Sequence, residues 1–485
     1  MIFNLQELIA LSPFFILILA VIIVILSIAY NRNHFSIAVF TVLSLSLTIF
    51  SLFFLILIVP INITSLVYIT KRSILYISMI IVSSLSSCIF AYRWLSRYSS
   101  NKEEFYLLML LSTLGAISLT ISNHMSSVFI SIELMSLPIF GLIAYSQSYK
   151  HALEASFKYL ILSGVTSSFL LLGISWIYAI FGNLNFLSIN QFFSSLLDGE
   201  KIIVLFGVIM MLMAFLFKLS VVPFHLWVGD IYQGSPSSVL SFFSVSGKIA
   251  IFSLLFYFFS NFYIFNNKII FLILSLISFF SILIGNLMAI FQKNIKRFFG
   301  YSSISQIGYL LTILLVSKNQ NFFSFQTSSI FLLNYLFANI AYFGFISLFS
   351  YSSDHDIDVI DSYRGLFWSQ PLLSTMITIV LLSLAGFPIT LGFIAKFSIF
   401  SIILKNHLWA LGFSFLIGTI LGFYGYLRLI INMYLSVCNS SFHNVKLSRS
   451  WLYTPSGMLI FFFSTMLLLF GLYPNPLIHL IKLAQ

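Results

Sequence analysis

Apolar runs of 18 or more residues recur along the whole chain, separated by short clusters of polar and charged residues. Each run is long enough to cross a bilayer whose hydrocarbon core is roughly 30 Å thick. Because 60% of the residues are hydrophobic and only 7% are charged, no segment between the runs could fold as a soluble domain. We therefore predict an all-α polytopic membrane protein, in contact with the lipid bilayer and forming a single membrane domain, 1–485. The fourteen predicted transmembrane spans are 9–30, 36–58, 74–95, 105–122, 126–147, 156–180, 202–229, 237–259, 268–291, 299–317, 327–350, 371–400, 407–435 and 457–480.

The same composition excludes several classes of protein. Two cysteines, Cys88 and Cys438, give neither a disulfide framework nor a metal-ligand spacing, and the eight histidines are scattered. Neither a phosphate loop nor a dinucleotide fingerprint is present, so we expect this chain to bind no metal and no cofactor. The net charge of +11 comes from basic residues dispersed through the loops, which favours a role in membrane topology over nucleic-acid binding. The first run follows Glu7 and no Lys or Arg, which indicates a transmembrane helix rather than a signal peptide.

Basic residues outside the spans indicate which side of the membrane each loop faces. Eleven of them, among them Arg93, Arg97 and Lys296, fall on one face, and seven, among them Lys71 and Arg72, fall on the other. The positive-inside rule makes the first face cytoplasmic. Because the number of spans is even, both termini are expected on the outer side.

Two of the predicted spans are interrupted by proline in similar polar surroundings. Pro223 stands in FKLSVVPFHLW, residues 217–227, and Pro388 stands in SLAGFPITLGFIAKF, residues 383–397, two positions after Gly386. Proline removes one helical hydrogen bond, and backbone groups freed at membrane depth need partners inside the protein or beside water. We therefore predict discontinuous helices at these two places.

The two breaks fall in the seventh and twelfth predicted spans, which are five spans apart. Spans 4–8 and 9–13 then form two five-helix units, 105–259 and 268–435, each broken in its fourth helix. Because five is odd, the second unit is inverted relative to the first, and interrupted spans at matching positions of inverted repeats indicate a transport site near the midplane. Three N-terminal helices in 1–104 and a C-terminal helix in 457–485 complete the domain. The alternative is two ordinary proline kinks.

Ionisable side chains inside the spans are the candidate proton carriers. Glu133 in IELMSLPIFGL is the only acid deep in a span, and Lys218 and Lys248 lie well inside spans 7 and 8. Lys158 and Lys396 lie nearer to span ends, where a lysine can extend toward the surface. Such groups are costly in a bilayer and mark ion pathways by default, so we predict a proton relay from Glu133 through Lys218 and Lys248 toward Lys396. A static ion pair between Glu133 and one lysine is the structural alternative.

Polar residues beside these groups extend the predicted relay. Gln306 and Tyr309 stand in NIKRFFGYSSISQIGYL, where they could hold water between the lysines. His225, two residues after Pro223, could gate entry from the cytoplasm or merely cap the broken helix. Moving one charge against 100 mV costs about 2.3 kcal/mol, and nothing in the sequence supplies that energy. We therefore expect the driving reaction in partner subunits or in another ion gradient.

Six stretches of the chain resemble signature segments of one known family. They are IELMSLPIFGL, SFKYLILSG, FKLSVVPFHLW with VGDIYQGSP, NIKRFFGYSSISQIGYL, YRGLFW and SLAGFPITLGFIAKF. They are similar to the antiporter-like subunits of respiratory complex I (NADH:quinone oxidoreductase), and the whole chain resembles the bacterial subunit N family, whose mitochondrial counterpart is subunit 2 of NADH dehydrogenase.

The resemblance implies a fourteen-helix fold with discontinuous helices 7 and 12, in the membrane arm of a complex in the bacterial inner membrane. It implies electron transfer from NADH through FMN and iron–sulfur clusters to quinone in other subunits, and proton pumping here without a redox centre. It assigns the family's key acid to Glu133 and its lysines of helices 6, 7, 8 and 12 to Lys158, Lys218, Lys248 and Lys396.

Three alternatives stay open. A free-standing cation/proton antiporter of the same superfamily would share the broken helices and the lysines, although YRGLFW and the end-to-end similarity argue against it. A scaffold subunit with an inactive proton path is favoured only by Gln306, because relatives commonly have a histidine there and glutamine cannot titrate. A solute transporter would need a substrate-sized polar cluster within the spans, which the sequence lacks.

Overall fold

Helices make up nearly all of the structure, a computed structural model that describes residues 4–98, 101–146, 149–192, 197–317, 321–350, 356–436 and 451–485. Within these residues, eleven helical segments are long and apolar enough to cross a membrane, so the chain is an all-α polytopic membrane protein, as predicted. They are α2 (Ser12–Tyr30), α3 (His34–Ile56), α4 (Lys71–Ser96), α6 (Met125–Ile143), α7 (Lys150–Phe181), α9 (Asp198–Lys218), α11 (Ser237–Phe243) taken with α12 (Ser246–Asn261), α13 (Lys268–Ile290), α15 (Asn321–Phe349), α19 (Trp409–Tyr434) and α20 (Pro455–Leu472).

Three of the fourteen predicted spans fall on helices that are not both long enough and apolar enough to be counted among these eleven. At the fourth predicted span, α5 (Glu104–Thr120) has only 17 residues. At the tenth, α14 (Ile295–Leu314) carries many polar residues and is buried along almost its whole length. The twelfth is divided between α17 (Pro371–Ala385) and α18 (Leu391–Lys405). The sequence therefore places a helix correctly in all three regions.

Two features of the fold differ from the prediction. The loop after α3 contains a short antiparallel hairpin of β1 (Ile61–Thr64) and β2 (Val67–Ile69), which we did not predict. The last predicted span ends early, because α20 stops at Leu472 and α21 (Asn475–Leu483) follows; Pro474 between them cannot continue the hydrogen bonding of α20. Four short helices complete the fold: α1 (Leu5–Ala10), α8 (Phe186–Phe192), α10 (Val228–Gly234) and α16 (Leu366–Ser369).

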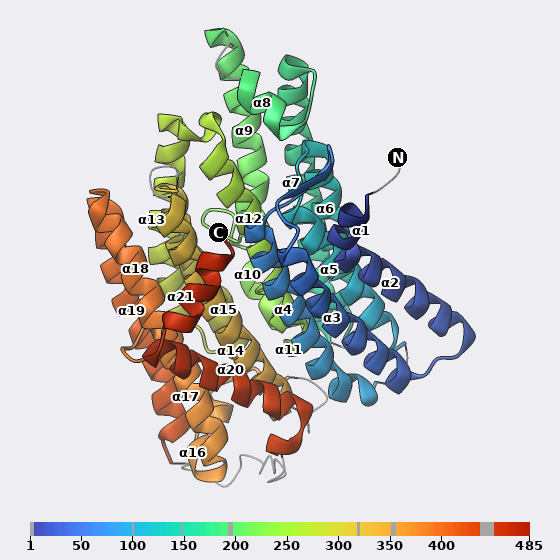
Figure 1. Cartoon of the computed structure of the whole chain (residues 1–485). Helices are drawn as coiled ribbons and strands as arrows, with labels where there is room; N and C mark the ends of the chain where they lie inside the picture. Colours follow the sequence, from blue (N-terminus) through green and yellow to red (C-terminus); the bar gives the residue numbers. More distant parts are fainter. Residues whose placement is uncertain are drawn as a thin grey trace.

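In three dimensions, α15 lies inside the bundle. It packs against α4, α11, α17, α18 and α20. Figure 1 shows α2 and α3 at one edge of the molecule and α13 and α19 at the opposite edge. The long apolar faces at these edges are exposed, as expected for helices that contact lipid or another subunit.

Both predicted helix interruptions are present. α9 ends at Lys218, and helix resumes only at Val228, where α10 begins. α17 ends at Ala385 and is followed by Gly386, whose φ of 86° lies in the left-handed region that favours glycine. A third interruption, which we did not predict, separates α11 from α12 four residues before Lys248.

Helices α7 and α9 approach closely because two glycines face each other where they cross. A Cβ on Gly173 would come within 2.5 Å of the carbonyl oxygen of Gly207, and one on Gly207 within 2.9 Å of that of Gly173. Small residues allow membrane helices this close contact. The two helices run antiparallel, so Ser163, ten residues before Gly173, lies beside Lys218, eleven residues after Gly207.

Most buried hydroxyls bond to their own helix. In α4, the side chains of Ser83, Ser84, Ser86 and Ser87 each donate to the carbonyl three residues earlier. Serine can therefore be buried with its hydrogen bond made. A lysine ammonium at the end of a long side chain needs acceptors from other elements, and these define the site below.

Candidate functional site

Lys218 is the last residue of α9 and is only 8% exposed. Its Nζ donates to Ser163 Oγ at 2.6 Å and lies 5.2 Å from the centre of the Tyr159 ring, both on α7. The described residues contain no carboxylate within ion-pair distance of it. Lys218 is thus a buried ammonium that is held by a neutral hydroxyl at the first break.

Glu133 lies on α6 near Lys218, but the two side chains are not paired. Lys218 and Tyr159 are ionisable groups within electrostatic range of its carboxyl group. Its Oε1 atom is buried, and it has no hydrogen-bond partner among the described residues. The static ion pair is therefore absent from the described part of the structure. A buried oxygen without a partner is a place where a proton or a water molecule can be accepted.

Lys248, on α12, is 3% exposed and is surrounded by hydroxyls from other helices. Its Nζ donates to Ser303 Oγ of α14 at 2.7 Å and to Tyr335 Oη of α15 at 3.4 Å. Tyr232 of α10 also donates to Ser303 Oγ, at 3.3 Å. Lys248, like Lys218, has neutral hydrogen-bond partners, and they come from two different helices, α14 and α15.

Lys396, on α18, folds back to the second break. Its Nζ donates to the carbonyl oxygen of Ala385, the last residue of α17, at 2.9 Å, and lies 5.5 Å from the centre of the Tyr309 ring. Lys396 is 8% exposed, so the suggestion that it extends to the membrane surface is wrong. Its side chain runs past Gly386, where a Cβ would come within 2.7 Å of Lys396 Cδ. Glycine at that position therefore provides both the turn and the space for the lysine.

Helix α14 lies between Lys248 and Lys396 and carries polar side chains along this interval. Ser303 contacts Lys248, and one turn later Gln306 Nε2 donates to the carbonyl of Leu384 and to Tyr426 Oη, both at 3.4 Å. Leu384 directly precedes Ala385, whose carbonyl binds Lys396. Gln306 therefore lies one helical turn from the contact with Lys248 and bonds to the residue that precedes the acceptor of Lys396.

The freed backbone groups of both breaks find side-chain partners. At the first break, the amide of Val222 donates to Ser281 Oγ of α13 at 3.1 Å. At the second, the amide of Gly392 donates to Ser383 Oγ at 3.2 Å, and Ser383 donates to Asn334 Oδ1 of α15 at 2.6 Å. These bonds satisfy the requirement that irregular backbone at membrane depth be supported by the protein.

Lys158 and His225 lie at the edge of this arrangement. Lys158 Nζ pairs with Asp230 Oδ2 and with Glu154 Oε1, both at 2.6 Å, and its side chain is 43% exposed. It therefore reaches toward the surface, one of the two roles that we considered. His225 lies within the first break, beside the exposed Pro223, and its Nδ1 atom is buried with no hydrogen-bond partner among the described residues.

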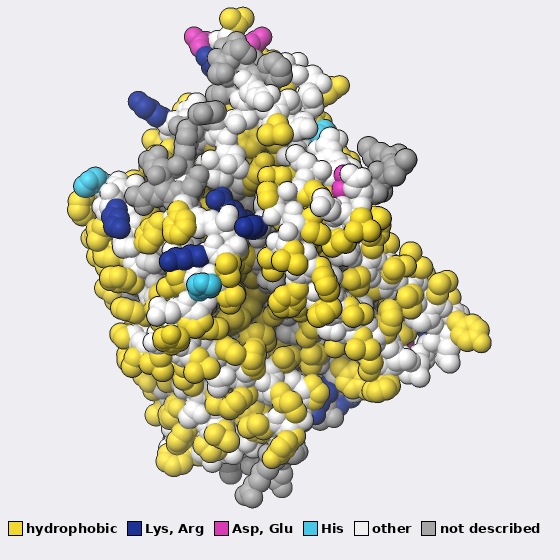
Figure 2. All heavy atoms as spheres, viewed as in Figure 1, with side chains coloured by type: hydrophobic (Ala, Val, Ile, Leu, Met, Phe, Trp, Pro, Cys, Tyr) yellow, Lys and Arg dark blue, Asp and Glu magenta, His cyan; other side chains and the backbone are white. Residues whose placement is uncertain are grey.

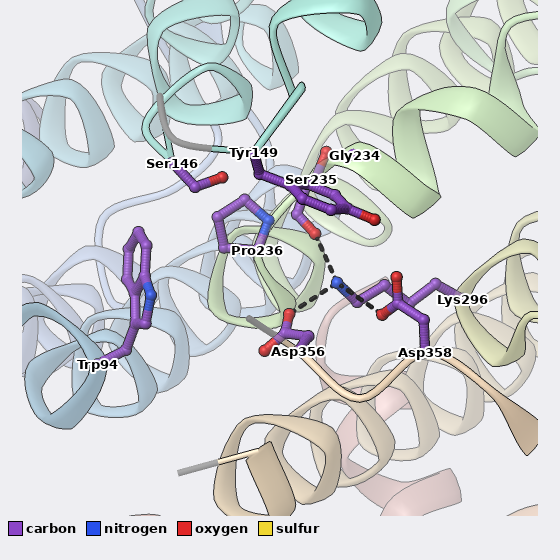
Figure 3. A pocket seen from close by; sticks show the side chains of 9 residues that line it. All are labelled: Trp94, Ser146, Tyr149, Gly234, Ser235, Pro236, Lys296, Asp356 and Asp358. Atoms are coloured by element: carbon purple, nitrogen blue, oxygen red, sulfur yellow. Dashed lines mark hydrogen bonds and ion pairs between the residues drawn. The ribbon is translucent and has the colours of Figure 1, made fainter. Parts of the chain in front are cut away.

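Sequence reasoning missed a buried charge cluster that Figure 3 shows, in which Lys296 points between Asp356 and Asp358. Its Nζ lies 2.7 Å from Asp356 Oδ2 and 3.3 Å from Asp358 Oδ1, and donates to the carbonyl of Ser235 at 3.0 Å. Burial raises the pKa of the Asp358 carboxyl, and the Lys296 ammonium offsets only part of that rise. We had assigned Lys296 to a loop as a topology signal. Two aspartates so close together in a chain with only twelve acidic residues were the available clue.

The cluster connects two elements of the site. Asp356 also accepts the backbone amide of Ser237, the first residue of α11, at 2.7 Å, while Lys296 belongs to the first turn of α14. α11 leads into the helix of Lys248, and α14 carries Ser303 and Gln306. The cluster thus fixes the relative position of the helices that meet at Lys248.

The described residues contain no group of three or more His, Cys, Asp or Glu side chains that could hold a metal ion. Cys88 is buried, and Cys438 lies outside the described residues. Among the described residues, the site brings together amines, hydroxyls, amides and carboxyl groups.

Comparison with known proteins identifies the family. Residues 122–422, which include Glu133 and the three buried lysines, match the family described as NADH:quinone oxidoreductase/Mrp antiporter, TM. The chain is 72% identical to NADH-quinone oxidoreductase subunit N of Buchnera aphidicola subsp. Schizaphis graminum (strain Sg), with all of both chains covered. It is 58% identical to the subunit N of Buchnera aphidicola subsp. Acyrthosiphon pisum (strain APS), over 99% of each chain.

The fold is also that of a solved relative. A chain of respiratory complex I from Thermus thermophilus with bound aureothin is 25% identical and superposes with a TM-score of 0.80, over 96% of this chain and 98% of that one. The family description alone would admit a free-standing antiporter, but the end-to-end identity to subunit N does not favour it. The chain belongs to the subunit N family of NADH-quinone oxidoreductase.

Proposed function

We propose that this chain translocates protons in the membrane arm of NADH-quinone oxidoreductase through a relay of Glu133, Lys218, Lys248 and Lys396. The observation that carries the proposal is the set of three buried lysines whose hydrogen-bond acceptors are hydroxyls and a carbonyl. Charged groups are expensive inside a membrane unless they are paired. A lysine with neutral partners can release its proton without leaving a carboxylate unpaired, so each is suited to alternate between two protonation states.

The order of transfer follows the contacts. Glu133 acts on Lys218 at the first break, and Ser303 and Gln306 of α14 continue from Lys248 toward Lys396 at the second break. The buried hydroxyl of Ser244, four residues before Lys248, has no hydrogen-bond partner among the described residues, and we propose that it takes part in the transfer from Lys218 to Lys248. Tyr309, beside Lys396, and His225, in the first break, act as secondary groups.

The energy for this transport comes from other subunits. In the proposed complex, partner subunits hold FMN and iron–sulfur clusters and pass electrons from NADH to quinone, and this chain carries no redox centre. Because moving a charge against 100 mV costs about 2.3 kcal/mol, proton transfer here must be coupled to that reaction. The other membrane-arm subunits are therefore obligatory partners.

The proposal includes a finer architecture of fourteen transmembrane helices with two inverted repeats, 105–259 and 268–435, in the bacterial inner membrane. Packing supports it, since the first two helices of each unit, α5 with α6 and α13 with α14, form two of the most extensive helix pairs. The breaks support it too, since a lysine lies at the end of α9 and another binds the end of α17. Both termini are proposed to lie on the periplasmic side.

A substitution of Lys218 tests the relay. The complex carrying Lys218→Ala, reconstituted into vesicles, should assemble but pump protons at least about tenfold more slowly, because a positioned proton carrier is missing. Lys201→Ala is the matched control, because Lys201 lies at the other end of the same helix and makes a surface pair with Asp198. Full pumping by the Lys218 variant would overturn the relay. That result would favour instead a scaffold subunit with an inactive proton path, which is the alternative indicated by Gln306.

A further inference from the structure

A basic cavity of about 440 Å³ lies where the chain enters α4, away from the proposed relay. Its lining includes Tyr68, Lys71, Arg72, Tyr76, Asn261 and Gln485. Its lining contains no Asp or Glu but includes the two basic residues Lys71 and Arg72. A concave site of this size with an excess positive charge fits an anionic group.

The two cations have no carboxylate partner. Lys71 and Arg72 form no ion pair and no hydrogen bond through their side chains within the described ranges. The Arg72 guanidinium lies 5.1 Å from the centre of the Phe325 ring, which leaves its N–H groups available. Tyr76 is 2% exposed, and its hydroxyl has no partner of normal hydrogen-bond geometry among the described residues. The side chains of Lys71, Arg72 and Tyr76 are therefore hydrogen-bond donors in this cavity for which the described residues supply no acceptor.

An apolar cavity of about 500 Å³ adjoins the basic one, and Lys71 lines both. Its walls come from α3, α4, α15, α20 and α21, with residues at helical spacing such as Ile74, Leu75 and Ser78 of α4. Figure 2 shows Lys and Arg side chains gathered at the upper edge of a hollow whose walls are hydrophobic. Charge thus lies at one end of a continuous depression and hydrocarbon at the other.

We propose that the two cavities together bind one anionic phospholipid, with its phosphate at Lys71 and Arg72 and an acyl chain in the apolar cavity. The first two residues of a transmembrane helix lie at the level of lipid headgroups, and the apolar cavity extends from there along α4 toward the membrane interior. Basic pockets between transmembrane helices are suited to anionic headgroups. α21, with Leu477 and Ile481 buried and Lys482 in its last turn, covers the apolar cavity in the manner of an interfacial amphipathic helix.

The test uses the purified complex in nanodiscs that contain phosphatidylglycerol with a photoactivatable acyl chain, and maps the labelled peptides. Wild type should be labelled on α3, α4, α15 or α21. The double variant Lys71→Ala with Arg72→Ala should lose labelling roughly tenfold or more, since two cations contribute. Lys268→Ala is the matched control, because Lys268 is the exposed first residue of α13 and lines neither cavity, and it should leave labelling unchanged.

A second variant tests the acyl-chain end separately. Ser78 bonds only to its own helix, so Ser78→Phe should fill the apolar cavity, leave the fold intact and abolish labelling of α3 and α15. Phosphatidylcholine with the same photoactivatable chain should label wild type weakly. Equal labelling by the two lipids, or displacement by free inorganic phosphate, would overturn the proposal. If the Ser78 variant loses a neighbouring subunit while its labelling is unchanged, a protein segment occupies the apolar cavity. That result would also overturn the proposal.

Discussion

Replacing Lys296 by Met tests whether the charge cluster of Figure 3 holds the helices that meet at Lys248. The lysine side chain is 3% exposed, and those of Asp356 and Asp358 are 15% and 13% exposed. Removing one partner of a buried ion pair costs about 3–5 kcal/mol, because it leaves an uncompensated buried charge. We expect the variant to lose stability by that amount.

The structure shows which carboxylate carries most of the cost. Asp356 keeps the backbone amide of Ser237 at 2.7 Å and the Ser237 hydroxyl at 3.2 Å. Asp358 keeps only a long contact with Asn294 Nδ2 at 3.5 Å among the described residues. The double variant Lys296→Met with Asp358→Asn should therefore recover most of the loss and come within about 1–2 kcal/mol of wild type.

The measurement is the temperature at which this chain leaves the soluble, assembled complex, followed in detergent by immunoblotting. The single variant should lose on the order of 5 °C. Lys293→Met, three residues earlier and exposed, is the control and should change nothing. A single variant as stable as wild type, or a double variant no better than the single, would refute the reasoning.

The loss should also depend on pH. Burial already raises the pKa of Asp358, and without Lys296 that pKa should rise further. A carboxyl whose pKa is raised by folding adds stability below its unfolded pKa, about 3.9, and this contribution disappears as the pH rises through the folded pKa. The difference between the single variant and wild type should therefore shrink as the pH falls from about 8 toward about 5. A difference independent of pH would point to lost packing instead.

Two further predictions concern the second break. Gly386→Ala should reduce proton pumping at least about tenfold, because the new Cβ would displace Lys396 and because an alanine at this left-handed φ costs about 1–3 kcal/mol. Gly412→Ala is the control and should pump normally, since its Cβ would meet no atom nearer than 3.5 Å. Gln306→His should pump as fast as wild type or faster, measured in vesicles at matched NADH oxidation, because imidazole can keep a hydrogen bond and also titrate. A collapse of pumping in that variant would mean that glutamine is specifically required.

Local chemistry made the breaks and the buried lysines predictable. Pro223 and Pro388 cannot continue a helix, and lysines within long apolar runs are conspicuous. The interruption between α11 and α12 falls at Ser244 and Val245, neither of which is a proline or a glycine, so it could not be inferred from the sequence. The same holds for Lys296, whose partners are about sixty residues away in sequence. The sequence alone does not show whether a charged loop residue is exposed to solvent or buried against other elements.

The three lysines of the proposed relay all lie close to a helix interruption, and their hydrogen-bond acceptors are uncharged. An unbroken helix uses its own carbonyls, so it offers a buried ammonium few acceptors. Lys396 uses the carbonyl that ends α17, and Lys248 uses Tyr335, whose hydroxyl itself donates to the carbonyl of Ser244 between α11 and α12. Lys218 ends α9 and uses a hydroxyl of the neighbouring helix. All three ammonium groups thus have acceptors that are polar but uncharged, so that the proton is held at membrane depth and can still leave. Replacing Ser163 or Ser303 by aspartate would hold the charge of Lys218 or Lys248 more tightly and should slow transport while strengthening the pair.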